Sequence, residues 1–229
     1  MNIILFGAQG SGKGTQAQML AEELKLQPRA SGELLREAIA HETPAGKIAK
    51  PYYDRGDLVP DEIVTEMILE SMRGANGIIL DGFPRTLRQA YLLDESLAKV
   101  GQRIDAAVYL EVPRDVLLDR LSGRWICRAH GHVWNVKTHP TRVPGICDYD
   151  GSPLYQRSDD SPETINRRLE KFFGETIPVV DYYARQGKLI RIDGTDTIEH
   201  VNQRILAGLS ALGQQSVVSA VAEDRTSGK

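Results

Sequence analysis

The sequence has few cysteines, few aromatic residues and no long hydrophobic run. Two cysteines among 229 residues cannot supply the dense disulfide framework that holds small secreted domains together. No hydrophobic stretch approaches the roughly 20 residues that a membrane-spanning helix needs. The N-terminus lacks the basic and hydrophobic regions of a signal peptide. These absences favour a cytoplasmic protein that does not associate with a membrane.

The sequence also lacks an excess of charge of one sign. Lys and Arg number 28 against 31 Asp and Glu, and the formal net charge is −3. A nucleic-acid-binding protein usually presents a basic face, so we expect no nucleic-acid partner. The length allows one sizeable domain with insertions or two small domains.

A glycine-rich segment, Gly7–Gln16, is the most informative part of the sequence. It follows the hydrophobic run Ile3–Phe6 and precedes the helical pattern Ala17–Leu24. A strand, a glycine-rich loop and a helix form the context of a phosphate-binding loop, where backbone N–H groups and the helix N-terminus surround phosphate oxygens. Lys13 would supply a positive charge for the terminal phosphates. The segment therefore predicts a nucleotide-binding protein.

One position departs from the general phosphate-loop motif. The residue after the lysine is Gly14, where the motif has a serine or threonine that binds magnesium, and the hydroxyl follows at Thr15. Magnesium would then be held mostly by phosphates and water. Motor ATPases and small GTPases become less favoured.

Five short hydrophobic runs predict the strands of one sheet. Helical patterns separate them, and strands that alternate with helices predict an α/β protein with a five-stranded parallel sheet covered on both faces. Ligands of such sheets bind at the carboxyl ends of the strands, where the glycine-rich loop lies. The predicted strands are Ile3–Phe6, Leu26–Ala30, Gly77–Leu80, Ala106–Leu110 and Leu189–Ile192. The predicted helices include Asp61–Met72, Arg88–Lys99, Arg114–Leu121 and Glu163–Gln186.

Three segments do not follow this alternation. Ser31–Pro60 has a helical pattern and would form an inserted lobe. The segment from Trp125 to about Arg157 is rich in Gly, Pro, His and Asp and holds both cysteines. It is either a functional lid or a small insert without a core of its own, with short β-like pieces such as His132–Trp134. We expect the polar tail 214–229 to be disordered.

Five motifs, in this order, resemble those of the adenylate kinases within the nucleoside monophosphate kinase family, specifically the long-lid bacterial type. The resemblance runs from Met1 to about Leu212. The motifs are Gly7–Gln16, Ser31–Arg36, Asp81–Thr86, Asp119–Arg124, and Arg157–Asp160 followed by Arg167 and Arg168.

The resemblance implies a P-loop NTPase-type fold and an ATP:AMP phosphotransferase. Such an enzyme transfers the terminal phosphoryl group of Mg-ATP to AMP and gives two ADP by direct in-line transfer. It also implies a core of residues 1–30, 61–124 and 160–213, an AMP-binding lobe of residues 31–60, and a lid of residues 125–159 that closes during the reaction. We expect a monomer.

The resemblance also assigns roles to the residues of these motifs. Guanidinium groups suit phosphoryl transfer because their donors match phosphate oxygens and they remain charged. The implied ATP-binding residues are Gly10, Ser11, Gly12, Lys13, Gly14, Thr15, Arg120 and Arg124. The implied AMP-binding residues are Ser31, Arg36, Gly82, Arg85, Gln89, Arg157 and Arg168. The implied catalytic residues are Lys13, Arg85, Arg120, Arg157 and Arg168.

Three further residues have two interpretations each. Asp81 anchors the water shell of magnesium or caps a nearby loop. Gln89 stands at the position that resembles the adenine-reading glutamine of the family, or it is a solvated helix residue. Trp134 stacks on the donor base or packs within the insert. Gln9 replaces the proline that is usual in the loop of the family.

The lid segment contains two pairs of candidate metal ligands with the same spacing. Cys127 and His130 lie three residues apart, as do Cys147 and Asp150. This spacing is typical of a zinc knuckle, and the resembling lids hold a structural zinc with three or four cysteines. His132 is an alternative to His130, and cobalt or iron are alternatives to zinc. A polar network without metal, or a disulfide, also remains open.

Two rival functions remain. The first is the same chemistry with UMP, CMP or GMP as acceptor. The second is a non-catalytic nucleotide-binding switch, which leaves six motif-placed arginines unexplained.

Overall fold

The computed structural model of the protein describes residues 1–157 and 160–226, without the side chains of residues 215–226. Ser158 and Asp159, which belong to the fifth motif and to the predicted lid, lie outside the described residues. Residues 227–229 of the predicted tail lie outside them as well.

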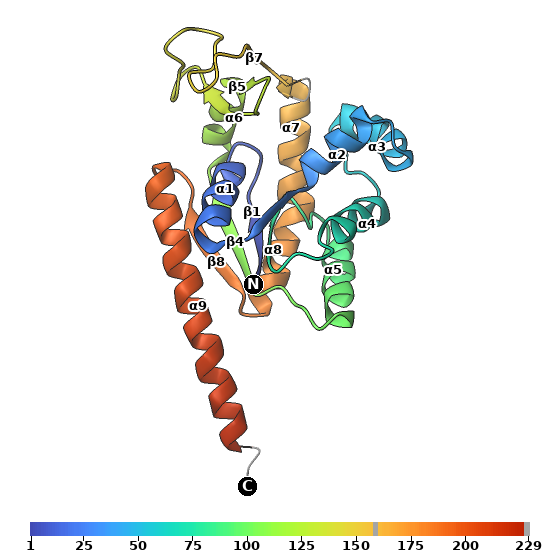
Figure 1. Ribbon diagram of the computed structural model, residues 1–229, viewed down its shortest axis with the longest axis vertical. Coiled ribbons are helices and arrows are strands. Elements are labelled where there is room, and N and C mark those ends of the chain that lie inside the picture. Colours follow the sequence, from blue (N-terminus) through green and yellow to red (C-terminus); the bar gives the residue numbers. More distant parts are fainter. Residues whose placement is uncertain (158–159, 227–229) are drawn as a thin grey trace.

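Five parallel strands form the central sheet, in the order β2-β3-β1-β4-β8 (Figure 1). All five predicted strands are confirmed, each to within one or two residues at its ends. Strand β1 pairs with β3 on one side and β4 on the other, so the loop that follows it starts from the middle of the sheet. The strands are β1 (Asn2–Phe6), β2 (Gln27–Ala30), β3 (Ile78–Asp81), β4 (Ala106–Glu111) and β8 (Leu189–Asp193).

Helices connect these strands and cover both faces of the sheet. They are α1 (Lys13–Leu24), α2 (Ser31–Ala40), α3 (Pro44–Arg55), α4 (Asp61–Ser71), α5 (Leu87–Lys99), α6 (Arg114–Ser122), α7 (Pro162–Lys171), α8 (Ile177–Arg185) and α9 (Ile198–Thr226). The single helix predicted over Glu163–Gln186 is divided by a π-helical turn, Phe172–Thr176. The helical pattern continues through that turn, which is why the sequence did not reveal it.

Alternate residues of the central strands pack into two separate hydrophobic clusters. Ile4 of β1 and Leu80 of β3 belong to the cluster beneath α4, α5, α7 and α8. Leu5 and Ile79 belong to the cluster beneath α1 and α9. All five residues of β1 are buried. A strand buried on both faces reads as a continuous hydrophobic run, and it gives the glycine-rich loop a rigid starting point.

Two smaller units extend from this layered body. Helices α2 and α3 pack against each other within the segment predicted as an inserted helical lobe. A three-stranded antiparallel sheet, in the order β6-β5-β7, lies within the predicted lid segment at the upper end of the molecule in Figure 1. Its strands are β5 (Arg124–Cys127), β6 (Val133–Asn135) and β7 (Leu154–Tyr155).

The last helix is longer than the sequence analysis expected. Helix α9 continues through Thr226 and extends away from the sheet (Figure 1), whereas residues 214–229 were expected to be disordered. Residues 214–226 contain neither proline nor glycine. A helix already nucleated on the sheet adds one hydrogen bond for each further residue, so it can continue where such breakers are absent.

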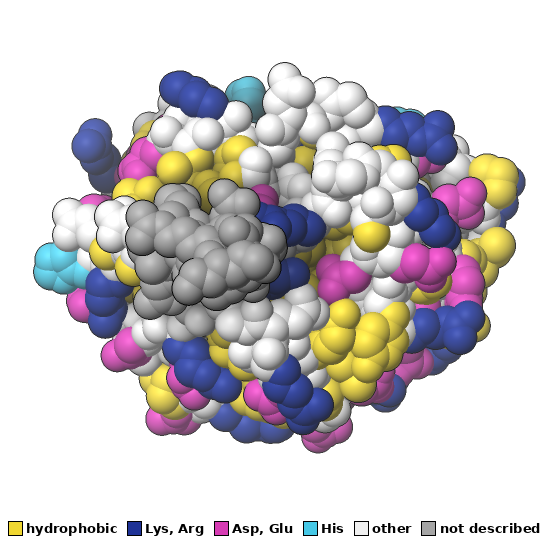
Figure 2. All heavy atoms as spheres, turned by 90° about the horizontal axis from the view of Figure 1, so that it is seen from below, with side chains coloured by type: hydrophobic (Ala, Val, Ile, Leu, Met, Phe, Trp, Pro, Cys, Tyr) yellow, Lys and Arg dark blue, Asp and Glu magenta, His cyan; other side chains and the backbone are white. Residues whose placement is uncertain are grey.

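The face of the molecule shown in Figure 2 carries charges of both signs. On the face shown in Figure 2, Lys and Arg side chains alternate with Asp and Glu. This face does not present the basic field typical of nucleic-acid binding. Among the described residues, no helix combines the length and the hydrophobicity needed to span a bilayer.

Candidate functional site

One large cavity, of about 970 Å³, lies at the carboxyl ends of the central strands. It is lined by every residue predicted to bind ATP or AMP, although these residues come from segments far apart in the sequence. They are Gly10, Ser11, Gly12, Lys13, Gly14, Thr15, Ser31, Arg36, Gly82, Arg85, Gln89, Arg120, Arg124, Arg157 and Arg168.

The glycine-rich loop folds back on itself before helix α1 begins. Gly10 and Gly12 have φ angles of 83° and 93°, a left-handed conformation that side-chain-bearing residues rarely adopt. The Ser11 N–H donates to the Ala8 carbonyl at 3.1 Å, and the Lys13 Nζ donates to the same carbonyl at 2.9 Å. The N-terminus of α1 therefore opens into the cavity beside a lysine amine, an arrangement that favours anions.

The amine of Lys13 lies in a desolvated and strongly positive environment. Burial and, to a smaller extent, the positive charges of Arg85, Arg168 and Arg124 lower the pKa of Lys13 to about 8, against the opposing effect of Asp81. Cations gathered out of water repel one another, so this arrangement disfavours the empty site. A bound polyphosphate would relieve that repulsion.

Arg85 is held at the end of β3 by neighbouring groups. Its Nε donates to the Gly82 carbonyl at 2.7 Å, and its Nη2 lies 3.4 Å from the Ser31 Oγ. Ser31 donates to the same carbonyl at 2.7 Å. Burial, with a smaller contribution from Arg168, lowers the pKa of Arg85 to about 10. Arg85 is thus an oriented guanidinium at neutral pH.

Gln89 is not a solvated helix residue, because its side chain is only 2% exposed and lines the cavity. Its Oε1 accepts from the Arg85 N–H at 2.7 Å, and its Nε2 donates to the Asp61 Oδ1 at 2.8 Å. Thr86 donates to the other oxygen of Asp61 at 2.9 Å. Sequence reasoning missed Asp61, although an acidic residue directly after Pro60 at a helix start was a visible signal.

Arg120 and Arg124 lie on the side of the phosphate-binding loop. The Nη1 of Arg120 donates to the Gly194 carbonyl at 3.0 Å and approaches the Gly10 carbonyl at 3.4 Å. Arg124 makes two hydrogen bonds to Asp160, one of them from Nε to Oδ2 at 2.9 Å. The side chain of Asp160 is 2% exposed. Sequence reasoning gave Asp160 no role, yet it orients an arginine at the root of the lid segment.

Arg36, Arg157, Arg168 and Lys171 add further cations to the lining. The effect of Arg168 on the pKa of both Lys13 and Arg85 shows that helix α7 brings its charge close to both residues. Lys13, on one side of the site, and Arg85, on the other, therefore share one electrostatic environment.

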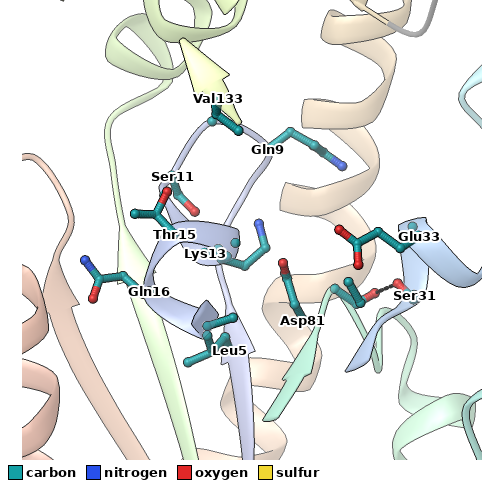
Figure 3. Close-up of a pocket in the computed structure, with 18 of the residues that line it drawn as sticks. Leu5, Gln9, Ser11, Lys13, Thr15, Gln16, Ser31, Glu33, Asp81 and Val133 are labelled. Atoms are coloured by element: carbon teal, nitrogen blue, oxygen red, sulfur yellow. Dashed lines mark hydrogen bonds between the residues drawn. The ribbon is translucent and has the colours of Figure 1, made fainter. Parts of the chain in front are cut away.

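Asp81 faces the phosphate-binding loop from the end of β3 (Figure 3). Its Oδ2 lies 3.7 Å from the place that a Cβ on Gly14 would occupy. A carboxylate oxygen thus stands near the position where the general motif carries a hydroxyl, and Thr15 also lines the cavity. Oxygen ligands of this kind suit magnesium, so the residues present fit that ion.

Four candidate metal ligands meet in the lid segment. Four potential ligand atoms lie within 4.8 Å of one another, one each from Cys127, His132, Cys147 and Asp150. The His132 Nδ1 is 3.3 Å from both the Cys147 Sγ and the Asp150 Oδ2, and the Cys127 Sγ is 3.0 Å from the same carboxylate oxygen. Two sulfurs, one imidazole and one carboxylate form a set that zinc accepts.

This group contains His132 in place of the predicted His130. The chain turns at Gly131, whose φ is 71°, and the Cys127 N–H donates to the His132 carbonyl at 2.9 Å. The turn brings His132 back beside Cys127, which sequence spacing alone does not show. His130 contacts Asp150 at 2.9 Å from outside the group, and its side chain is 67% exposed.

Both cysteines are free thiols, each 1% exposed, so the disulfide alternative is wrong. Trp134 packs beside them with 4% exposure, and its ring stacks on His139 with centroids 4.7 Å apart. The packing interpretation of Trp134 is therefore confirmed, although the residue also borders the cavity.

Comparison with known proteins agrees with this site. The model of the family described as "Adenylate kinase" matches residues 5–188. A protein named adenylate kinase from Carboxydothermus hydrogenoformans is 46% identical over 88% of this chain and 95% of its own length. Proteins of the same name from Acidothermus cellulolyticus and Streptomyces avermitilis are 44% and 45% identical, each over 91% of this chain and 98% and 97% of their own lengths.

Proposed function

The chain belongs to the adenylate kinase family and is an ATP:AMP phosphotransferase, and we propose that transfer takes place within the single cavity described above. The observation that carries this proposal is the convergence of all fifteen predicted nucleotide-binding residues on that one cavity.

On the donor side, the phosphate-binding loop and Lys13 receive the phosphates of ATP. Backbone N–H groups of Gly10–Thr15 and the N-terminus of α1 supply hydrogen bonds and a favourable dipole. Arg120 and Arg124 flank the same side from α6 and β5, where carbonyl groups and Asp160 orient them. The donor is thus held by several directed contacts.

On the acceptor side, Arg36 and Arg85 bind the phosphate of AMP. Ser31 and Gly82 fix the orientation of Arg85, and the absence of a side chain at Gly82 leaves room for the nucleotide. Gln89 lies beside them with one amide N–H beyond the bond to Asp61, and this N–H donates to the adenine. Fixing Gln89 through Asp61 would make the base contact specific.

Between the two nucleotides, Lys13, Arg157 and Arg168 act on the transferring group. Phosphoryl transfer spreads negative charge over the equatorial oxygens, so oriented cations stabilise the transition state more than the ground state. Magnesium, when bound, neutralises phosphate charge, and Asp81 and Thr15 are the residues that would hold its water shell. No proton needs to pass through a side chain before the acceptor oxygen attacks.

Residues 31–60 and 125–159 move as two units against the core of residues 1–30, 61–124 and 160–213. Closing both units excludes water, which would otherwise receive the phosphoryl group in place of AMP. The α2–α3 lobe carries Arg36 to the acceptor, and the lid carries Arg157. Because each unit closes on its own nucleotide, we expect the enzyme to work as a monomer.

The lid holds a structural zinc ion through Cys127, His132, Cys147 and Asp150. Among the lid residues that the structure describes, the small hydrophobic cluster has Cys127, Trp134 and Cys147 as its buried members. Four protein ligands leave no open position for substrate, so the metal would stabilise the lid and take no part in the chemistry. Cobalt or iron would fit the same ligand set.

The pair Arg85 and Arg88 offers a direct test of this proposal. Arg85 lines the cavity, whereas Arg88 points away, is 67% exposed and pairs with Glu62. We expect Arg85→Ala to lower kcat/KM for AMP by about 10² to 10³-fold and Arg88→Ala to change it less than about twofold. Steady-state formation of ADP with both variants measures this. Equal effects of the two substitutions would contradict the proposed acceptor site.

A further inference from the structure

Gln9 is a polar residue of the cavity lining whose side-chain oxygen has no hydrogen-bond partner among the described residues. It lies between Ala8 and Gly10 in the phosphate-binding loop and lines the cavity. Its Oε1 has no contact with solvent and no hydrogen-bond partner among the described residues. A buried carbonyl oxygen without a donor costs free energy, so such a group is informative in a native site.

The side chain of Gln9 points from the phosphate-binding loop toward helix α7. Figure 3 shows it above the amine of Lys13, with Val133 of the lid strand β6 on its other side and its amide directed toward helix α7. The amine of Lys13 donates a hydrogen bond to the backbone carbonyl of Ala8, the residue next to Gln9. Because Gln9 and Lys13 line the same cavity and Lys13 is hydrogen-bonded to the neighbour of Gln9, we expect the carboxamide to lie close to the terminal phosphate of ATP.

This placement matters because a carboxamide offers two N–H donors and one oxygen acceptor. The cavity lining around Gln9 supplies matching groups once nucleotides are bound. Phosphoryl oxygens accept hydrogen bonds, and the guanidinium groups of the lining, such as those of Arg124 and Arg168, donate them.

We propose that Gln9 is an additional catalytic residue of this enzyme, whose Nε2 donates a hydrogen bond to a non-bridging oxygen of the transferring phosphoryl group. Its Oε1 accepts a hydrogen bond from a guanidinium group of the cavity when the lid closes. This inference rests on the proposed site of phosphoryl transfer.

The step itself needs no new reactant. A phosphate oxygen of AMP forms a bond to the terminal phosphorus of ATP, the bond from that phosphorus to the bridging oxygen breaks, and ADP leaves with the electron pair. Gln9 exchanges neither atoms nor protons. It contributes a dipole that is aligned before the reaction and that interacts most strongly when the equatorial oxygens carry the developing charge.

The first test replaces Gln9 by methionine, an unbranched residue of similar length without hydrogen-bonding groups. We expect Gln9→Met to lower kcat by about 10- to 100-fold while KM for ATP and for AMP changes less than about threefold. Gln203→Met is the matched control, since Gln203 is exposed on α9 and lies outside the cavity. A kcat for Gln9→Met within twofold of the wild type, or a loss confined to KM, would overturn the proposal.

The second test is Gln9→Glu, which gives a readout that a purely structural role would not produce. An ionised glutamate repels the phosphoryl group, whereas a protonated one can donate the same hydrogen bond as the amide. The ratio of the kcat of Gln9→Glu to that of the wild type should therefore rise as pH falls from about 8 toward 5. A ratio independent of pH would contradict a direct contact.

The two proposals can fail separately. Absence of ADP formation by the wild-type enzyme would reject the site of phosphoryl transfer itself. Normal wild-type activity with unaffected Gln9 variants would reject only the role of Gln9. Circular dichroism melting of each variant shows whether a loss of activity reflects unfolding.

Discussion

The central sheet and the lid of this enzyme are stabilised in different ways. The sheet is packed between two large hydrophobic clusters, to which nearly every residue of β1, β3 and β4 contributes. The lid has a cluster of three fully buried residues, and two of these are the cysteines. Hydrophobic burial thus stabilises one region, whereas the other depends on a few polar and sulfur-containing side chains.

This difference matches what each region does in the reaction. The phosphate-binding loop must keep its shape, and it is anchored by a strand buried on both faces. In the proposed mechanism the lid moves as a unit, and a small unit cannot bury enough hydrophobic surface to be stable alone. A metal bound by four side chains stabilises such a unit without fixing it to the core.

The largest predicted effect on activity comes from replacing Lys13, which lies in the phosphate-binding loop above the central sheet. We expect Lys13→Ala to lower kcat/KM by about 10³-fold or more, because it removes the charge nearest the transferring phosphates. The melting temperature should not fall, since the buried amine is destabilising in the empty site. Lys99→Ala, which removes an exposed ion pair with Glu95, is the control and should leave both quantities unchanged. A large drop in the melting temperature of Lys13→Ala would contradict the view that Lys13 serves phosphate binding and does not stabilise the fold.

A second prediction concerns the lid alone. Cys147→Ser should release the metal and make the lid segment 125–157 susceptible to proteases, while the core resists cleavage as in the wild type. Metal analysis and mass spectrometry of limited digests measure these two effects. Simultaneous unfolding of the core would contradict the view that the two regions are stabilised separately.

The two histidines of the lid allow a finer test. His132→Ala removes one of the four proposed ligands and should weaken zinc binding by more than about 100-fold, beyond the loss typical of removing an outer hydrogen-bond partner. His130→Ala should weaken it only a few-fold, because His130 contacts Asp150 from outside the ligand group. Competition with a zinc chelator measures both affinities. The reverse order would restore His130 as the ligand.

The smallest predicted effect is a pH dependence of ATP binding. The pKa of Lys13 in the empty site is lowered from 10.5 to about 8, so its charge is lost as pH rises through about 8. If only the charged form binds ATP well, affinity should be about tenfold weaker at pH 9 than at pH 7, with uptake of a proton on binding. Calorimetry in buffers of different ionisation enthalpy tests this. Constant affinity over that range would show that Lys13 remains charged in the empty site.

The sequence predicted the region with regular packing better than the region without it. The five strands and the phosphate-binding loop follow from hydrophobic periodicity and from glycine positions, which are local signals. In the lid, only the strand around His132–Trp134 was anticipated. Strand β7 has two residues and is too short to produce a periodic signal, whereas β5 begins at Arg124, within a motif that the sequence analysis did not interpret as a strand.

The errors share a physical origin, because each depends on contacts between residues distant in sequence or on a local change in the chain path. The positive φ of Gly131 brings His132 beside Cys127, and spacing favoured His130 instead. Asp61 holds Gln89 across 28 positions, and Asp160 holds Arg124 across 36. The residues of these pairs are visible in the sequence, but their pairing is not.

The most direct test of the central claim is product formation from Mg-ATP with AMP, GMP, CMP and UMP in separate reactions, resolved by chromatography. The account predicts rapid formation of ADP with AMP and much slower transfer to the other three. Comparable transfer to UMP, CMP or GMP would contradict the assigned role of Gln89. Absence of transfer to any acceptor would contradict the assignment of this cavity to phosphoryl transfer.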